Sequence, residues 1–366
     1  MEAASVPVKQ PAIAAVLRVV RSFLKQYGLI VVLLALPVIC AIGDLAGWNK
    51  FLFIEFSDEG DLSRLATNLK DGVSNGAIWA LVALGYTLVY GIIELINFAH
   101  GEVFMLGSFV SFALWGTLGL TLTTGTLGVV GGLIVTLIVA MVICGVLNVM
   151  IERVAYRPLR NAPKLAPLIT AVGFSFILQN VGLLWLGGQF HSVPDLIEAQ
   201  HIVTQVGGVP ITNGDVLAIT ATVPLVLLLT FFVSQSRLGK AMRATAQDPE
   251  AARLMGINVD TTISMTFLLG GLLAGAAGLI YALYQTTIWF FQGFTAGLIA
   301  FTAAVMGGIG NLRGAVLGGI IIGCIQQISD NRIGASWTPA VVFAYLVLIM
   351  VFRPQGLLGE ETREAG

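Results

Sequence analysis

Charged side chains are scarce in this sequence. Only 11% of the 366 residues are Asp, Glu, Lys or Arg and 57% are hydrophobic, whereas about 25% charged residues are usual in a soluble domain. Four long stretches carry no charge at all: 103–151, 165–194, 261–312 and 333–352. Because about 20 apolar residues cross the hydrocarbon core as a helix, the two longest stretches must each hold two membrane passes. This scarcity excludes an ordinary soluble domain.

Cysteine and histidine are also rare, with three of each. Cys40, Cys144 and Cys324 lie in apolar runs, where a thiol usually acts as a small buried hydrophobe. We therefore expect no disulfide framework and no metal site. The three histidines are too scattered to suggest the metal or nucleophile site of an intramembrane enzyme, and we expect that the chain is not an enzyme.

Two further absences limit the ligands. The net charge is −1, so no basic field indicates nucleic acid. The sequence also lacks a P-loop, because Gly239-Lys240 is followed by Ala241 and Ser234 stands where the first glycine would be. We expect no cofactor in this chain, and ATP with its Mg²⁺, if used, would be bound by a partner.

The apolar runs predict an all-α, polytopic transmembrane helical bundle of eight to ten spans. Runs such as 133–145 and 341–352 are apolar on every side, unlike the alternating strands of a membrane barrel. The predicted spans are 27–47, 72–95, 102–122, 127–150, 166–187, 214–235, 262–285, 296–311, 314–330 and 336–352. The eighth and ninth are short, so we expect them to be tilted, broken or re-entrant rather than two full crossings.

Orientation follows from the Lys and Arg residues in the loops. The N-terminal arm, the segment 153–164 and the segment 237–253 carry four each, whereas 188–214 carries none. Because basic loops stay in the cytoplasm, we expect these three segments and both chain termini there. Membrane lipid is therefore an expected partner.

The chain is predicted to have three parts. Residues 1–70 form an N-terminal extension with a first transmembrane helix and a periplasmic loop. Within it, residues 13–25 have the spacing of an interfacial helix, although a frayed basic tail remains the alternative. The main membrane domain covers 71–359, including a cytoplasmic loop at 236–262, and residues 360–366 form a cytoplasmic tail.

That cytoplasmic loop contains a short helix with both ends marked. Asp248 is the expected N-cap, Pro249 occupies the first helical position, Glu250 complements the positive helix end, and Gly256 supplies a left-handed residue that ends the helix. Two turns are too short to be stable alone. The segment, which also contains Ala251, Ala252 and Leu254, must therefore pack against another subunit or simply cap the membrane domain.

Polar residues interrupt the apolar pattern at 94–102. Glu94, Asn97, His100 and Glu102 follow one apolar run and precede another. They form either a solvated cytoplasmic turn, which we favour for Glu94, or a broken helix that lines a pathway, for which Asn97, His100 and Glu102 are candidates. Gln179 is a further candidate, although interhelical hydrogen bonding is its favoured role.

A second interruption is rich in glycine. The segment 307–319 contains six glycines, among them Gly307, Gly308 and Gly310. Such a segment disfavours a regular helix and allows close backbone approach. It predicts either a hinge in a discontinuous element or tight helix packing without a break.

Four spaced motifs carry a family resemblance. They are LGYTLVYG at 84–91, INFAHGE at 96–102, ERVAYRP at 152–158, and AFTAAV at 300–305 followed by GGIG at 307–310. Together they resemble the first permease subunit of the bacterial branched-chain amino-acid ABC importers, over about residues 70–359. Glu250-Ala251-Ala252, three residues and Gly256 are similar to the loop of ABC importer permeases that docks in a cleft of the ATPase.

The resemblance implies a bacterial inner-membrane assembly. It would contain this chain, a second related permease, two ABC ATPase subunits, and a periplasmic or external solute-binding protein that delivers leucine, isoleucine or valine. Importers of urea or short amides share the architecture and stay an alternative. A secondary transporter driven by an ion gradient is disfavoured, because the central spans lack paired acids and bases.

Overall fold

The computed structural model describes residues 28, 30–31, 33–51, 54–56, 62–121, 124–160, 162–163 and 165–359. Most of this part of the chain is helical. After the apolar helix Leu33–Leu45 come α2 (Ser63–Ile93), α3 (His100–Thr117), α4 (Thr126–Ile151), α5 (Leu165–Leu186), α6 (Asn213–Gln235), α7 (Arg237–Gln247), α8 (Pro249–Leu254), α9 (Val259–Gln285), α10 (Gln292–Gly307), α11 (Leu312–Ser329) and α12 (Thr338–Phe352). The predicted interfacial helix at 13–25 and the tail at 360–366 lie outside the described residues.

Six of the described helices are long and apolar enough to cross a membrane. They are α2, α4, α5, α6, α9 and α11. The α4 span continues through the π-helical turn Glu152–Tyr156 and the 3-10 turn Arg157–Leu159, and the α11 span through the π-helical turn Asp330–Gly334. This turn corrects one prediction, because it lengthens the supposedly short ninth segment to 23 residues. The eighth segment is short, as predicted, with 16 residues in α10. The predicted boundary at residue 70 also falls inside a helix, since α2 begins at Ser63.

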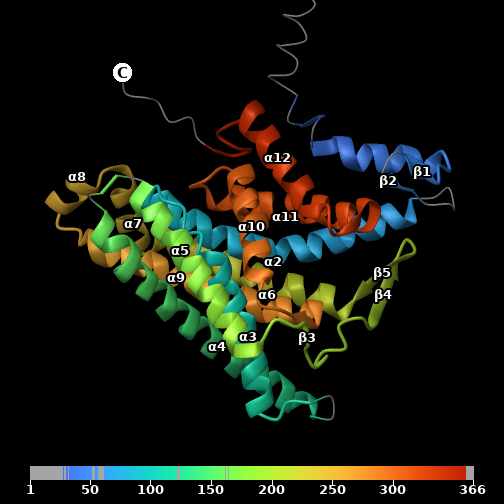
Figure 1. Ribbon diagram of the computed structural model, residues 1–366, viewed down its shortest axis with the longest axis horizontal. Coiled ribbons are helices and arrows are strands. Elements are labelled where there is room, and N and C mark those ends of the chain that lie inside the picture. Colours follow the sequence, from blue (N-terminus) through green and yellow to red (C-terminus); the bar gives the residue numbers. More distant parts are fainter. Residues whose placement is uncertain are drawn as a thin grey trace, which may run out of the picture.

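Helix α2 lies in the middle of the bundle and packs along α11 and α9, while α4 packs along α9 (Figure 1). Glycines permit the α2–α11 contact. A Cβ atom added to Gly76 would lie 2.8 Å from the carbonyl oxygen of Gly319, and one added to Gly323 would lie 2.4 Å from the Cα atom of Gly76. Small residues on facing helices therefore bring the two backbones together, as is usual where helices associate in lipid.

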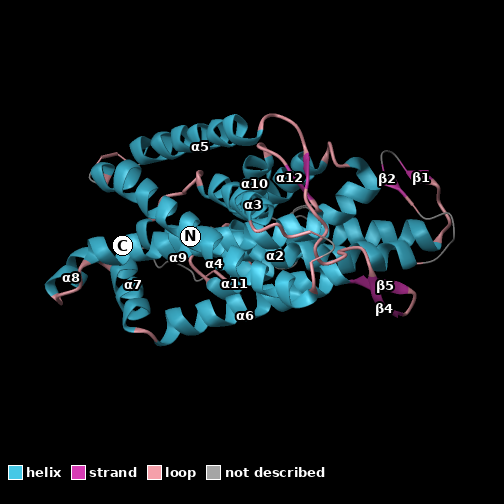
Figure 2. Cartoon of the chain, turned by 90° about the horizontal axis from the view of Figure 1, so that it is seen from below, coloured by secondary structure: helices cyan, strands magenta, loops and turns pink. Residues whose placement is uncertain are grey.

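The two ends of the molecule differ. Helices α7 and α8 lie at one end, and the hairpins β1–β2 and β4–β5 lie at the other (Figures 1 and 2). The all-α prediction missed three short antiparallel pairs: β1 (Lys50–Phe51) with β2 (Ile54–Glu55), β3 (His191–Ser192) with β6 (Thr287–Ile288), and β4 (Ile202–Val206) with β5 (Val209–Thr212). Their strands are at most five residues long, so hydrophobic periodicity gives almost no signal for them.

The glycine-rich interruption is a break between two helices. Helix α10 ends at Gly307, and the next residue, Gly308, has a φ of 105° that favours glycine. Asn311 caps α11 by accepting hydrogen bonds from the backbone N–H groups of Arg313 and Gly314. The C-terminal segment covers the break, since the N–H of Leu358 donates to the carbonyl of Gly307 at 3.0 Å. The alternative of an unbroken packed helix is therefore wrong.

Candidate functional site

The predicted capped helix is confirmed as α8. The Asp248 carboxylate accepts hydrogen bonds from the N–H groups of Glu250 and Ala251 at 2.9 and 3.0 Å, and Pro249 is the first helical residue. Gly256 has a φ of 82°, as expected of the residue that ends a helix. Helix α8 is thus a well-defined helix of six residues at one end of the molecule.

One side of α8 is buried and the other is exposed. Ala252 is buried against the protein, whereas Leu254 is 89% exposed and Met255 is 83% exposed. Helix α7 supports α8, and the guanidinium of Arg243 holds the end of α6 by donating to the carbonyls of Val233 and Ser234. Two large apolar side chains, Leu254 and Met255, are therefore exposed at the C-terminal end of α8, a helix that packs against α7 and α9.

The polar stretch at 94–102 divides into an exposed and a buried part. Glu94 caps the C-terminus of α2 in a left-handed conformation and is exposed, which agrees with the predicted turn. Asn97, His100 and Glu102 are buried instead. The solvated-turn alternative is wrong for these three residues, because Asn97 in the link between α2 and α3, and His100 and Glu102 in the first turn of α3, all lie inside the bundle.

Asn97 belongs to a buried chain of hydrogen bonds that joins three segments. Its amide donates to Asn148 of α4 at 3.1 Å, and the Asn148 amide donates to the backbone carbonyl of Phe267 in α9 at 2.6 Å. The Tyr156 hydroxyl donates to the carbonyl of Ile96 at 3.0 Å. These contacts fix the link between α2 and α3 against α4 and α9.

His100 lies close to α2. Its ring packs edge-on against Tyr86 with ring centroids 4.9 Å apart, and a Cβ atom at residue 85 would come within 2.2 Å of the His100 Nε2 atom. Only glycine therefore leaves room for the imidazole at Gly85.

Glu102 is the buried acidic group of α3 and lies between α5 and α10. Its Oε1 atom accepts a hydrogen bond from the Ser175 hydroxyl at 3.2 Å. On the α10 side, a Cβ atom added to Gly293 would lie 2.2 Å from Oε2. The carboxylate thus occupies space that any side chain at residue 293 would fill.

Ser175 and Gly293 also line a cavity of about 60 Å³ between α5 and α10. Its other walls are apolar or aromatic and include Tyr86, Phe98 and Phe301. The Tyr86 and Phe98 rings each lie 6.2 Å from the Phe301 ring, measured between centroids. The Glu102 carboxylate therefore lies against two residues, Ser175 and Gly293, that line this mainly apolar hollow.

The remaining candidates have different positions. Gln179 follows Ser175 by one helical turn on α5 and is buried, so both side chains lie on the inward face. Gly307, Gly308 and Gly310 lie at the turn between α10 and α11 and do not line the cavity.

Sequence analysis missed several residues of the site. Asn148 was detectable because it is an isolated amide in the apolar run of α4. Gly293 and Gly297 were detectable because they are small residues four positions apart on α10. Ser175 carried no such signal, since its role depends on the approach of α3 to α5.

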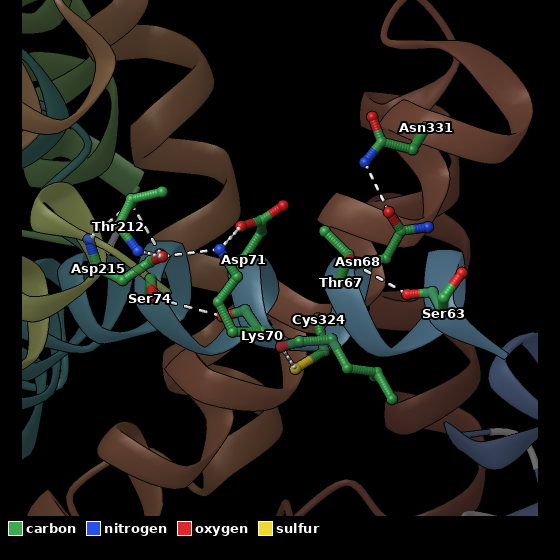
Figure 3. A network of polar contacts seen from close by, with 11 residues as sticks. Ser63, Thr67, Asn68, Lys70, Asp71, Ser74, Thr212, Asp215, Cys324 and Asn331 are labelled. Carbon is green, nitrogen blue, oxygen red and sulfur yellow. Dashed lines mark hydrogen bonds and ion pairs between the residues drawn. The ribbon is translucent and has the colours of Figure 1, made fainter. Parts of the chain in front are cut away.

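A polar cavity of about 440 Å³ lies beside β5, at the end of the molecule away from α8. Figure 3 shows the polar contacts of Lys70, Asp71 and Asp215 at this cavity. Lys70 on its wall forms ion pairs with Asp71 at 2.5 Å and with Asp215 at 2.7 Å. Asp215 also accepts from the N–H of Thr212 at 2.9 Å, in a capping box that begins α6. This cluster joins the start of α2 to the β5–α6 junction.

Comparison with known proteins identifies the family. The model of the family described as "Branched-chain amino acid transport system / permease component" matches residues 68–352. The chain belongs to this permease family. This permease is 41% identical over 292 residues to the high-affinity branched-chain amino acid transport system permease protein LivH of Escherichia coli K12, covering 79% of this chain and 94% of that protein.

Two other relatives, one bacterial and one archaeal, are less similar in sequence than LivH of Escherichia coli. The permease is 39% identical to the Pseudomonas aeruginosa permease protein BraD, with 80% of this chain and 94% of BraD covered. It is 24% identical to a probable branched-chain amino acid transport permease of Methanocaldococcus jannaschii, with 81% and 93% covered. No solved structure matches the permease. The helix Leu33–Leu45 and the β1–β2 hairpin precede the family match.

Proposed function

We propose that this permease is a transmembrane subunit of an ATP-driven ABC importer that carries branched-chain amino acids across the bacterial inner membrane. Its partners would be a second related permease, two ABC ATPase subunits and an external solute-binding protein. The family match and the identity to LivH and BraD support this proposal. The permease itself would supply a path and a coupling contact, while the ATPases would bind ATP and Mg²⁺.

In this proposal the chain crosses the membrane ten times with both termini in the cytoplasm. The ten spans would be the helix Leu33–Leu45 and α2, α3, α4, α5, α6, α9, α10, α11 and α12. Basic residues support the orientation, since Arg153, Arg157 and Arg160 and the arginines of 237–253 occur at the end that carries α8.

The observation that carries the coupling role is the surface of α8. Leu254 and Met255 are adjacent and almost fully exposed at the end of the molecule, and contiguous exposed apolar side chains at a water-facing surface mark protein contact sites. A cleft in an ATPase subunit would bury both side chains. Movement of the ATPases during ATP binding would then reach the bundle through α7 and α9, which contact α8.

The solute path in this proposal runs beside α5 and α10. The cavity between them has aromatic walls, and a second small hollow, lined also by Tyr90, Ile96 and Ile309, shares Tyr86 and Phe301 with it. Apolar and aromatic walls suit an aliphatic solute that must pass without being held tightly.

Site-directed cross-linking tests the coupling role directly. Leu254→Cys and the control Leu127→Cys replace leucines of equal exposure, 89%, one on α8 and one at the start of α4. The native Cys40 and Cys144 are buried. We expect the purified complex to contain two P-loop ATPases, and a short thiol-to-amine cross-linker to join residue 254 but not residue 127 to an ATPase. Equal cross-linking at both positions, or a chain that transports without ATPases, would contradict the proposal.

A further inference from the structure

We propose that the Glu102 carboxylate binds the ammonium group of the transported amino acid while the solute passes the aromatic cavity between α5 and α10. This inference rests on the proposed function and deepens it by assigning the polar contact in the path. The ligand class is a small aliphatic solute with one primary ammonium group. Glu102 would act as a binding residue, and no covalent step is involved.

The first argument is the incomplete pairing of a buried carboxylate. Oε2 of Glu102 is buried and has no hydrogen-bond partner among the described residues, whereas Oε1 has only the Ser175 hydroxyl. An unpaired charge inside a membrane protein is costly, and such residues usually face a binding site or pathway. No lysine, arginine or histidine side chain forms an ion pair with Glu102 in the described part of the chain. A cation that visits the site would provide the missing partner.

The second argument is the route from the cavity to the carboxylate. Ser175 and Gly293, the two residues that flank the Glu102 carboxylate, both line the cavity. Because Gly293 has no side chain, no side chain of that residue separates Oε2 from the space between α5 and α10. A solute that enters between these helices would therefore meet the carboxylate first at the wall formed by Gly293 and Ser175.

The third argument is that the position of Glu102 in its helix partly offsets the cost of burying a negative charge. Glu102 lies in the first turn of α3, which begins at His100. The N–H groups at a helix N-terminus stabilise an anionic side chain. The same carboxylate would then attract an ammonium group, while the aromatic rings of Tyr86, Phe98 and Phe301 would contact its methylene and methyl groups and add cation–π attraction.

The cavity is too small for a whole leucine in this conformation. Its volume is about 60 Å³, and α5 makes only a limited contact with α10. The proposal therefore requires α5 to move away from α10 during transport, which would uncover the Glu102 carboxylate at the step when the solute passes.

Uptake by the complete importer tests the proposal. The reconstituted complex of both permeases, the ATPases and the binding protein would carry wild-type, Glu102→Gln, Glu102→Asp or Ser111→Ala permease, the last being a control at a buried hydroxyl of α3 that bonds to the carbonyl of Gly107. We expect Glu102→Gln to lower leucine uptake at least tenfold with ATPase activity retained, Glu102→Asp to lower it less, and Ser111→Ala to change it less than twofold. Uptake by Glu102→Gln equal to that of the wild type would overturn the proposal, because glutamine replaces glutamate well in a purely structural first-turn position.

The same experiment separates two kinds of failure. If the wild-type complex hydrolyses ATP but takes up no branched-chain amino acid, the proposed function is wrong. If the wild type transports leucine and Glu102→Gln does so equally well, only the role of Glu102 is wrong.

A second measurement does not depend on the stability of the Glu102→Gln variant. Ser175→Cys places a thiol at the cavity wall in a background where the three native cysteines are replaced by alanine. During turnover we expect the ratio of the rate with a cationic 2-aminoethyl methanethiosulfonate to the rate with its anionic 2-sulfonatoethyl counterpart to be about tenfold higher than the same ratio for a free thiol in solution, and leucine to slow the cationic reaction. A ratio equal to that of the free thiol, or no protection by leucine, would contradict an ammonium site beside Glu102.

Discussion

Asp44 and Arg332 form a buried bidentate ion pair. The Nη1 and Nη2 atoms of Arg332 donate to the two carboxylate oxygens of Asp44, each at 2.7 Å, and neither side chain is exposed. Nη1 of Arg332 also donates to the backbone carbonyl of Glu55. The pair joins the helix Leu33–Leu45, which precedes the family match, to the π-helical turn after α11. The N-terminal extension is therefore attached to the bundle by a specific polar contact.

Removal of one member of this pair is expected to destabilise the permease more than removal of both. Arg332→Met leaves the Asp44 carboxylate buried without the guanidinium that contacts both of its oxygens, and loss of one member of a buried pair typically costs about 3–5 kcal/mol. Replacement of both residues by apolar ones, Asp44→Leu with Arg332→Met, should recover most of this loss. Thermal unfolding of the solubilised protein for both single variants and the double variant measures the coupling. Single-variant losses that simply add in the double variant would contradict the pairing.

Substitution of Gly256 is expected to uncouple ATP hydrolysis from leucine uptake. Valine is branched at Cβ and adopts the φ of 82° found here only with strain, so Gly256→Val should disturb the end of α8. We expect the complex to assemble and hydrolyse ATP while leucine uptake falls at least tenfold. Gly256→Asn is the matched control, since asparagine tolerates the left-handed region, and should keep most of the uptake. Normal ATP-driven uptake by Gly256→Val would refute the coupling role of α8.

Two glycine-to-alanine substitutions should change stability in opposite directions. A Cβ atom on Gly76 would lie 2.8 Å from the carbonyl oxygen of Gly319, whereas one on Gly116 would meet nothing within 4 Å. Gly76→Ala should therefore cost about 1–3 kcal/mol through forced separation of α2 and α11. Gly116→Ala, within α3, should stabilise by about 0.5–1 kcal/mol. Parallel unfolding curves of the two variants check the prediction, and a neutral Gly76→Ala would show that α2 and α11 approach less closely.

Asn148 is expected to contribute to stability through its two hydrogen bonds. Asn148→Ala leaves the buried amide of Asn97 without its acceptor and removes the second donor to the Phe267 carbonyl of α9, at a cost of about 1–3 kcal/mol. Asn180→Ala provides the control, because the Asn180 amide is exposed and, among the described residues, donates within α5 to the carbonyl of Phe176. Equal unfolding temperatures for the two variants would argue against the buried network.

The apolar pattern predicted much of the fold because lipid imposes a strong constraint on sequence. Every predicted span from residue 72 onward overlaps a described helix, and Asp248 and Gly256 have the capping geometry that their positions indicated. These features depend on local sequence alone. The extension of α11 by the π-helical turn at Asp330–Gly334 was missed. A charged residue such as the one at position 330 is typical of the end of a membrane helix, and it does not indicate that the helical conformation continues.

The cavity was less predictable because it depends on contacts between distant segments. Glu102 was a candidate as an acidic residue next to an apolar run, but nothing local showed that Ser175 and Gly293 would flank it. The pairing of Asp44 with Arg332, 288 positions apart, was likewise invisible to sequence periodicity. Long-range side-chain pairs of this kind follow from how helices pack, and packing is not encoded in the pattern of one segment.

The central claim is that this permease imports branched-chain amino acids at the expense of ATP. The most direct measurement is leucine accumulation in proteoliposomes that contain the permease, its related partner permease and the two ATPases, with the binding protein outside and ATP inside. The account predicts accumulation against a gradient that requires hydrolysable ATP and persists when ion gradients are dissipated. Accumulation that continues without ATP and collapses with an ion gradient would contradict it.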